Sequence, residues 1–163
     1  MVAVGGLRMR EAYASLDGPV LVLIAALIPV GEAIHATGGA DLVAGWLSHL
    51  LGAAPPLLSL AAVMLLAMIS APFMHNAPTV LVFGPIAASF AQRLHFNPDA
   101  FLMAVAVGAA SDFLTPIGHQ CNTLVMAPGG YRFSDYPRLG APLSLAVLAV
   151  GTVLISLVWP LAN

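Results

Sequence analysis

The strongest constraint on this chain is the placement of proline and polar residues inside long apolar runs. Residues 55–94 form an apolar block that is too long for one helical crossing, yet the stretch FMHNAPT at residues 73–79 puts a histidine and an asparagine in its middle. Pro72 lies just before this stretch and Pro78 lies within it. Non-helical backbone inside a bilayer is tolerated only where protein or a water-filled cavity satisfies it. The stretch therefore predicts either a polar site at membrane depth or a turn outside the membrane.

The composition is that of an integral membrane protein. Of the 163 residues, 60% are hydrophobic and 7% are charged, which is far from the composition of soluble domains. The five basic residues are all arginine and do not cluster, so we expect no nucleic-acid binding. The only cysteine, Cys121, allows no intrachain disulfide and no cysteine metal site. Without a plausible pair of nucleophile and base, we expect neither an enzyme nor a resident metal or organic cofactor.

Four apolar blocks with short polar interruptions predict an all-α, polytopic membrane protein. The first and the last block are long enough to cross a hydrocarbon core of roughly 30 Å at about 1.5 Å per residue. We expect one membrane domain, residues 1–163, with a cytoplasmic N-terminal segment (1–17), a first crossing (19–39), an interfacial helix (40–52), a helical hairpin (55–94), a broken helix (100–128) and a transmembrane helix (139–161).

The hairpin and the broken helix each contain a predicted interruption. TPIGHQCNT at residues 115–123 cannot form a continuous regular helix, because Pro116 lacks an amide hydrogen and Gly118 lacks a side-chain constraint. The hairpin at 55–94 leaves two alternatives open: two full crossings joined by a turn, or a re-entrant hairpin whose tip stops inside the membrane. The tip has no Lys, Arg or Asp, and this absence slightly favours the re-entrant form.

Arginine placement predicts the orientation. Arg8 and Arg10 precede the first crossing, and Arg132 and Arg138 precede the last one, so both hairpin alternatives put these four on the same side. Only Arg93 lies on the other side. The positive-inside bias therefore predicts a multi-pass protein of the inner (plasma) membrane with a cytoplasmic N-terminus and a hairpin that opens from the outside.

Two polar interruptions in one short chain predict a shared site. Broken helices in transporters point their N-terminal amides at anions and use unwound carbonyls to coordinate cations. Asn76 is a candidate for such a site, and His75 is a candidate to bind an anion or relay protons. Asp112, Glu32 and His119 are possible proton-relay or structural residues, since an intramembrane acid is a functional hypothesis and Asp112 could instead hold the kink.

Several motifs resemble one transporter family. They are the asparagine at the hairpin tip, PIA at 85–87, NPD at 97–99, TPIGHQCNTLV at 115–125 and PGGYRFSDY at 128–136. Over residues 11–160 the chain is similar to the C-terminal portion of the divalent-anion/sodium symporters, within the ion-transporter superfamily that includes citrate transporter-like domains. The segment 115–122 is the most specific part of the resemblance.

The resemblance implies a fold of two inverted repeats, each with a re-entrant hairpin and a discontinuous transmembrane helix. This chain would supply part of the second repeat, so a missing N-terminal repeat or a partner chain is expected, as is a homodimer. At the second hairpin's Ser-Asn-Thr signature, His75 and Ala77 replace the serine and the threonine. The substrate- and ion-binding positions that the resemblance implies are His75, Asn76, Ala77, Thr79 and, in the unwound segment, Thr115, Pro116, Gly118 and Asn122.

The expected function is secondary active transport of an anion, sulfate or a di- or tricarboxylate, coupled to sodium or protons. Its partners would be the lipid bilayer and a small anionic solute, and sodium is the possible bound ion. The alternative is a non-transporting membrane fragment or a subunit of a split carrier.

Overall fold

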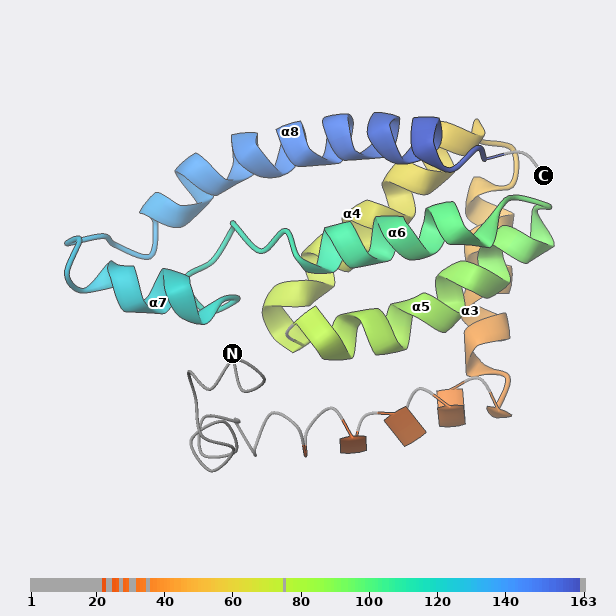
Figure 1. The fold of residues 1–163 in the computed structure, drawn as a ribbon, viewed down its shortest axis with the longest axis horizontal. Helices are drawn as coiled ribbons and strands as arrows, with labels where there is room; N and C mark the ends of the chain where they lie inside the picture. Colours follow the sequence, from red (N-terminus) through yellow and green to blue (C-terminus); the bar gives the residue numbers. More distant parts are fainter. Residues whose placement is uncertain are drawn as a thin grey trace, which may run out of the picture.

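The computed structural model describes residues 22, 25–26, 28–29, 32–34, 36–74 and 76–161. These residues form helices and connecting loops (Figure 1), so the all-α prediction is confirmed. In chain order the helices are α3 (Gly39–Leu51), α4 (Pro56–Met74), α5 (Asn76–Arg93), α6 (Pro98–Ala109), α7 (Gln120–Met126) and α8 (Asp135–Val158). Most of the first apolar block, residues 19–39, lies outside the described residues.

Helices α4, α5 and α6 form the centre of the fold. The helices α4 and α5 make an antiparallel hairpin, and α6 packs against both of its arms (Figure 1). Phe101 of α6 meets Phe90 of α5 edge to face at 5.6 Å between ring centroids, and it stacks on Phe96 at 5.9 Å. This aromatic cluster fixes the end of the core where α5 turns into α6, which is the end away from the hairpin tip.

Small residues bring the helices into close contact. A Cβ atom added to Gly108 of α6 would lie 2.5 Å from the Met64 carbonyl oxygen and 2.9 Å from the Cβ of Ala67, both on α4. A Cβ added to Gly151 of α8 would lie 2.9 Å from the Met64 Cε. Close approach through glycine and alanine is typical of helices that associate in membranes, where packing has to supply the attraction.

The hairpin tip is more helical than the sequence predicted. Helix α4 continues through Pro72 to Met74, and α5 begins at Asn76 with Pro78 as its third residue. Proline fits the first turn of a helix, because the amide hydrogen that it lacks would have no intrahelical partner there. The two arms therefore end and begin on either side of position 75, which itself lies outside the described residues.

Helix α8 also differs from its predicted range of 139–161. It begins at Asp135, where Pro137 occupies the third helical position, and it ends at Val158, two residues before Pro160. Proline at these two places is compatible with the first turn and with a helix end, respectively. With 24 residues, α8 has a length of about 36 Å. Both α4 and α8 are long and apolar enough to cross a membrane.

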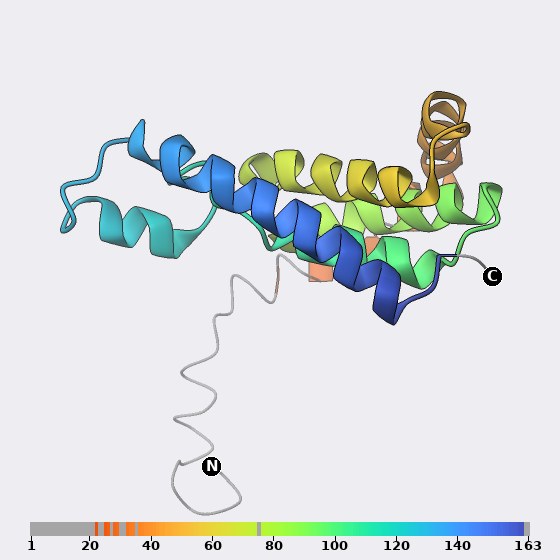
Figure 2. The ribbon, with the colours of Figure 1, turned by 90° about the horizontal axis from the view of Figure 1, so that it is seen from above.

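Helix α7 lies beyond the central helices. In Figures 1 and 2, α7 and the first turns of α8 extend past the hairpin tip, while the rest of α8 runs along α4 and α6. The chain between α6 and α7 thus leaves the core at about the level of the tip. This arrangement places the two interruptions that the sequence predicted at the same end of the hairpin.

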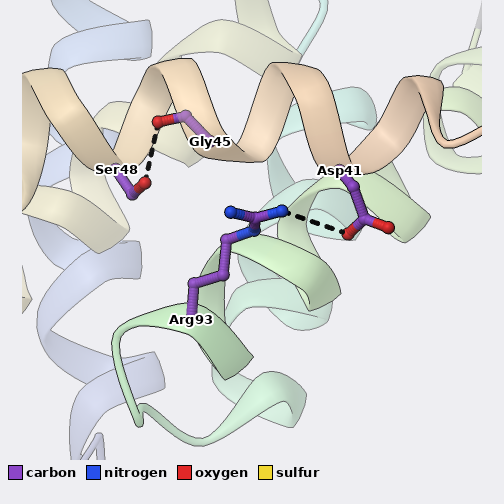
Figure 3. Close-up of polar contacts among 4 residues, drawn as sticks. All are labelled: Asp41, Gly45, Ser48 and Arg93. Carbon is purple, nitrogen blue, oxygen red and sulfur yellow. Dashed lines mark hydrogen bonds and ion pairs between the residues drawn. The ribbon is translucent and has the colours of Figure 1, made fainter.

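Helix α3 crosses the opposite end of the hairpin (Figures 1 and 2) and packs on α5. Arg93, the last residue of α5, reaches over Gly45 of α3, and its Nη2 lies 3.8 Å from Asp41 Oδ1 (Figure 3). Both side chains are about half exposed, so the ion pair is worth little in water. The ion pair connects the last residue of α5 with the first turn of α3.

We expect the Gly108→Ala substitution to destabilise the fold by about 1–3 kcal/mol, because its methyl group would press on the α4 backbone. The matched control is Gly84→Ala, whose Cβ would meet only Leu102 Cδ2 at 3.7 Å, an ordinary contact. Thermal unfolding of both variants in detergent micelles measures the difference. A Gly108→Ala variant as stable as Gly84→Ala would contradict the close α4–α6 contact.

Candidate functional site

The hairpin tip presents Asn76 as the first residue of α5. The Oδ1 atom of Asn76 is buried and has no hydrogen-bond partner among the described residues. Thr79, one turn further along α5, is fully buried, whereas Ala77 is exposed. His75 lies outside the described residues. The tip therefore offers one buried amide oxygen at a helix N-terminus, next to the C-terminus of α4.

The second interruption runs from the end of α6 at Ala109 to the start of α7 at Gln120. The last turn of α6 is closed by its own groups: the Ala110 amide donates to the carbonyls of Ala106 and Gly108, and Ser111 Oγ donates to the Val107 carbonyl at 2.6 Å. Beyond Ser111 the chain is non-helical up to His119. We call residues 110–119 the break.

Side chains of the break and of the first turn of α7 hold the break in shape. Asn122 Nδ2 donates to the carbonyl oxygens of Asp112 and Thr115 at 3.1 and 3.2 Å. Thr123 Oγ1 donates to the Pro116 carbonyl at 2.7 Å, and the Gly118 amide donates to Thr115 Oγ1 at 3.3 Å. These bonds satisfy backbone groups that no helix pairs, as a dry environment requires.

Gly118 makes room for the carboxylate of Asp112. A Cβ atom at Gly118 would overlap both carboxylate oxygens of Asp112, so the carboxylate lies directly against the Gly118 backbone. Asp112 is only 4% exposed. The break and α7 therefore bring together four of the predicted site residues: Asp112, Thr115, Gly118 and Asn122.

The tip and the break lie at the same level of the fold. Helix α5 has 18 residues and α6 has 12, and because the two are antiparallel and joined by a short loop, α6 ends about 9 Å before the level of the tip. The break covers this remaining length, as Figures 1 and 2 show for the C-terminal end of α6. The C-terminus of α4 and the N-terminus of α5 meet at the tip, and the C-terminus of α6 points toward the same end of the fold. The two C-termini carry partial negative charge and the N-terminus carries partial positive charge.

The other predicted residues have different surroundings. Glu32 is exposed. His119 is exposed and caps α7, because its Nδ1 accepts a hydrogen bond from the Cys121 amide at 3.2 Å. Asn122 was predicted in the unwound segment, and this placement is wrong: it lies in the first turn of α7, since the cap at His119 starts the helix before it.

Three residues of this region were not predicted from the sequence. Thr123 holds the Pro116 carbonyl, Tyr136 Oη donates to the Asn122 carbonyl at 2.6 Å, and a Cβ at Gly140 would overlap the Phe113 carbonyl oxygen. Thr123 could have been predicted, because it is the last residue of the polar motif at 115–123. The contacts of Tyr136 and Gly140 depend on how α8 folds back, which no local pattern indicates.

The chemistry of the site is that of oxygen atoms and helix ends. Among the described residues, no group of three His, Cys, Asp or Glu side chains could hold a metal ion. The available groups are backbone carbonyls, the Asn76 amide oxygen, hydroxyls and one carboxylate, which suit a hard cation. The described fold and site define a class of helical membrane protein whose interrupted helices place polar backbone beside a shared region.

Comparison with known proteins agrees with this class. The citrate transporter family model matches residues 1–162, so the chain belongs to the citrate transporter family. An uncharacterized transporter of Synechocystis (sll0640) is 39% identical over 98% of this chain. Sodium/sulfate cotransporter 2 of Chlamydomonas reinhardtii is 29% identical over 92%, and Na⁺/dicarboxylate cotransporter 3 of the mouse is 24% identical over 93%.

The chain spans only part of these relatives. It covers 26% of the Synechocystis protein, 17% of the Chlamydomonas protein and 24% of the mouse protein. The family consists of transporters rather than enzymes. Family membership and the two apolar helices α4 and α8 make the chain a membrane protein.

We expect the Asn122→Ala substitution to loosen the break, because two backbone carbonyls lose their donor. At about 1 kcal/mol for each hydrogen bond, amide exchange in residues 115–123 should accelerate by roughly thirtyfold. Hydrogen exchange followed by mass spectrometry measures this rate.

Asn97→Ala is the matched control for this experiment. Asn97 Oδ1 accepts a hydrogen bond from the Asp99 amide at 3.0 Å and caps the other end of α6. Its loss should affect the start of α6 and leave the break unchanged. Equal exchange in the break for wild type and Asn122→Ala would show that the two Asn122 bonds do not hold it.

Proposed function

We propose that this chain carries part of the binding site of a secondary active transporter for a small divalent anion, sulfate or a dicarboxylate, with sodium as the coupling ion. The observation that carries the proposal is the convergence of the hairpin tip and the break at one level of the fold. Membership of the citrate transporter family supports it. The substrates come from the names of the sodium/sulfate and Na⁺/dicarboxylate cotransporters among the relatives.

In this proposal, sodium is coordinated by oxygen atoms of the two interruptions. The C-termini of α4 and α6 supply partial negative charge, and the Asn76 Oδ1 atom, buried and without a partner among the described residues, supplies a ligand. The substrate anion is held next to the sodium ion by the N-terminus of α5 and by amide and hydroxyl groups. Sodium is then a transported ion and not a resident cofactor.

The membrane arrangement is also part of the proposal. We propose that α8 crosses the inner membrane and that the hairpin is re-entrant with its tip near the membrane midplane. The support is that α7 and the first turns of α8 extend past the tip, although α8 is about as long as a bilayer core is thick (Figures 1 and 2). The N-terminus is cytoplasmic in this orientation, as the arginine distribution predicts.

The site would be completed by protein outside these residues. A complete carrier would add the other inverted repeat, from the same or a partner chain, and would assemble as a homodimer. Alternating access then moves the hairpin and the broken helix against that scaffold. Helix α3 would lie at the membrane interface, because Leu42, Trp46 and Leu50 form an exposed stripe along it.

The test is uptake of labelled sulfate and of succinate into proteoliposomes that contain the complete carrier, with sodium and pH gradients imposed separately. We expect Asn76→Ala to lower uptake about tenfold or more at limiting sodium, because an ion loses a ligand, without lowering the amount of protein in the membrane. Gln92→Ala, which removes an exposed amide near the other end of α5, should transport normally.

Each alternative has its own outcome in this assay. Uptake that follows a pH gradient and ignores sodium would replace sodium by proton coupling. Uptake by Asn76→Ala equal to that of wild type would remove Asn76 from the site. No uptake of either anion by the wild-type carrier would contradict the transport proposal and favour a non-transporting fragment.

A further inference from the structure

Helix α7 organises the break but has little support of its own. It contains seven residues, and a helix of that length is marginal in isolation. It lies outside the core formed by α4, α5 and α6 (Figures 1 and 2). Most of its side chains with a described environment are exposed. The position of Asn122, and with it the shape of the break, therefore needs an anchor elsewhere.

The start of α8 provides that anchor. Tyr136 Oη donates to the carbonyl oxygen of Asn122 at 2.6 Å and so connects α8 to the first turn of α7. One turn later, Gly140 lies against the Phe113 carbonyl, inside the break. Helix α8 thus supports the break in two ways, directly at Phe113 and indirectly through Asn122 of α7.

The loop before α8 fixes Tyr136 in turn. The Arg132 amide donates to Asp135 Oδ2 at 2.8 Å, and the ring of Tyr131 meets the ring of Tyr136 edge to face at 6.4 Å. A cleft of about 290 Å³ lies between α7, this loop and α8, and both Tyr136 and Asn122 line it. The Tyr136 hydrogen bond connects α7 and α8 across the edge of this cleft.

We propose that Tyr136 is a positioning residue of the transport site. Its hydroxyl holds the first turn of α7 so that Asn122 Nδ2 stays aligned with the carbonyls of Asp112 and Thr115. Tyr136 contacts neither ion nor anion, and it acts through Asn122. This inference rests on the proposed transport function, because the break matters for binding only if it forms part of the site.

The first test is hydrogen exchange on the intact protein in lipid nanodiscs. Tyr136→Phe keeps the ring and removes the hydroxyl, so exchange in residues 115–123 should accelerate about fivefold, as expected for one lost hydrogen bond, while α4 and α5 exchange as in wild type. The matched control is Tyr131→Phe, since the Tyr131 hydroxyl makes no hydrogen bond within the described residues. Tyr131→Phe should leave the exchange of the break unchanged.

The second test separates positioning from general stabilisation. In an Asn122→Ala background, Tyr136→Phe should accelerate the exchange of the break less than it does alone, because only Thr123 then still connects the first turn of α7 to the break. In sodium-dependent uptake by the complete carrier, Tyr136→Phe should raise the half-saturating sodium concentration about fivefold and leave the maximal rate unchanged.

The inference is overturned if Tyr136→Phe leaves the exchange of the break at the wild-type rate, or if its effect is as large in the Asn122→Ala background as alone. A fall in maximal rate with unchanged half-saturation would also overturn it. If the wild-type carrier takes up neither anion, the proposed function fails, whereas the two exchange measurements still decide whether Tyr136 positions the break.

Discussion

The structure depends on one physical requirement: the carbonyls of a non-helical segment need donors where water cannot supply them. The break meets this requirement mainly with two side chains of α7, Asn122 and Thr123, which donate to three carbonyl oxygens. Without these donors, the buried carbonyls would be unpaired at a cost in free energy. With them, the break has one defined backbone conformation. Within the break the Asp112 carboxylate lies against Gly118, where only glycine leaves space for it.

Helix ends contribute partial charges around the site, in addition to the buried Asp112 carboxylate. The C-termini of α4 and α6 and the N-terminus of α5 lie toward the same end of the fold and carry opposite partial charges. Such a region can hold an anion and a cation next to each other without the desolvation that a buried arginine would require. The small number of charged side chains near the site agrees with the composition, in which only 7% of the residues are charged.

Residue types alone predicted an all-α chain and an interruption at residues 115–123, because proline, glycine and apolar length act locally. Pro116 and Gly118 lie within the break, but the break begins at Ala110, before the first residue of the predicted interruption, and Asn97 caps α6 directly before Pro98. Local rules failed at Pro72, which α4 accommodates. They also could not predict the roles of Asn122 and Tyr136, since the direction of one amide and a hydrogen bond across 14 residues depend on how α7 and α8 fold back. The positions that bind ion and anion remain predictions.

The glycine contact between α6 and α4 has a mechanical consequence. At Gly108 the two helices touch through backbone and β-carbon atoms, with no long side chain between them that could change rotamer. Helix α6 therefore cannot slide along α4 without a steric clash, and packed interfaces of this kind move as blocks rather than deform continuously. The hairpin and α6 are therefore expected to move as one rigid unit. The backbone of the segments at its ends, such as the break that leads to α7, has to change conformation when that unit moves.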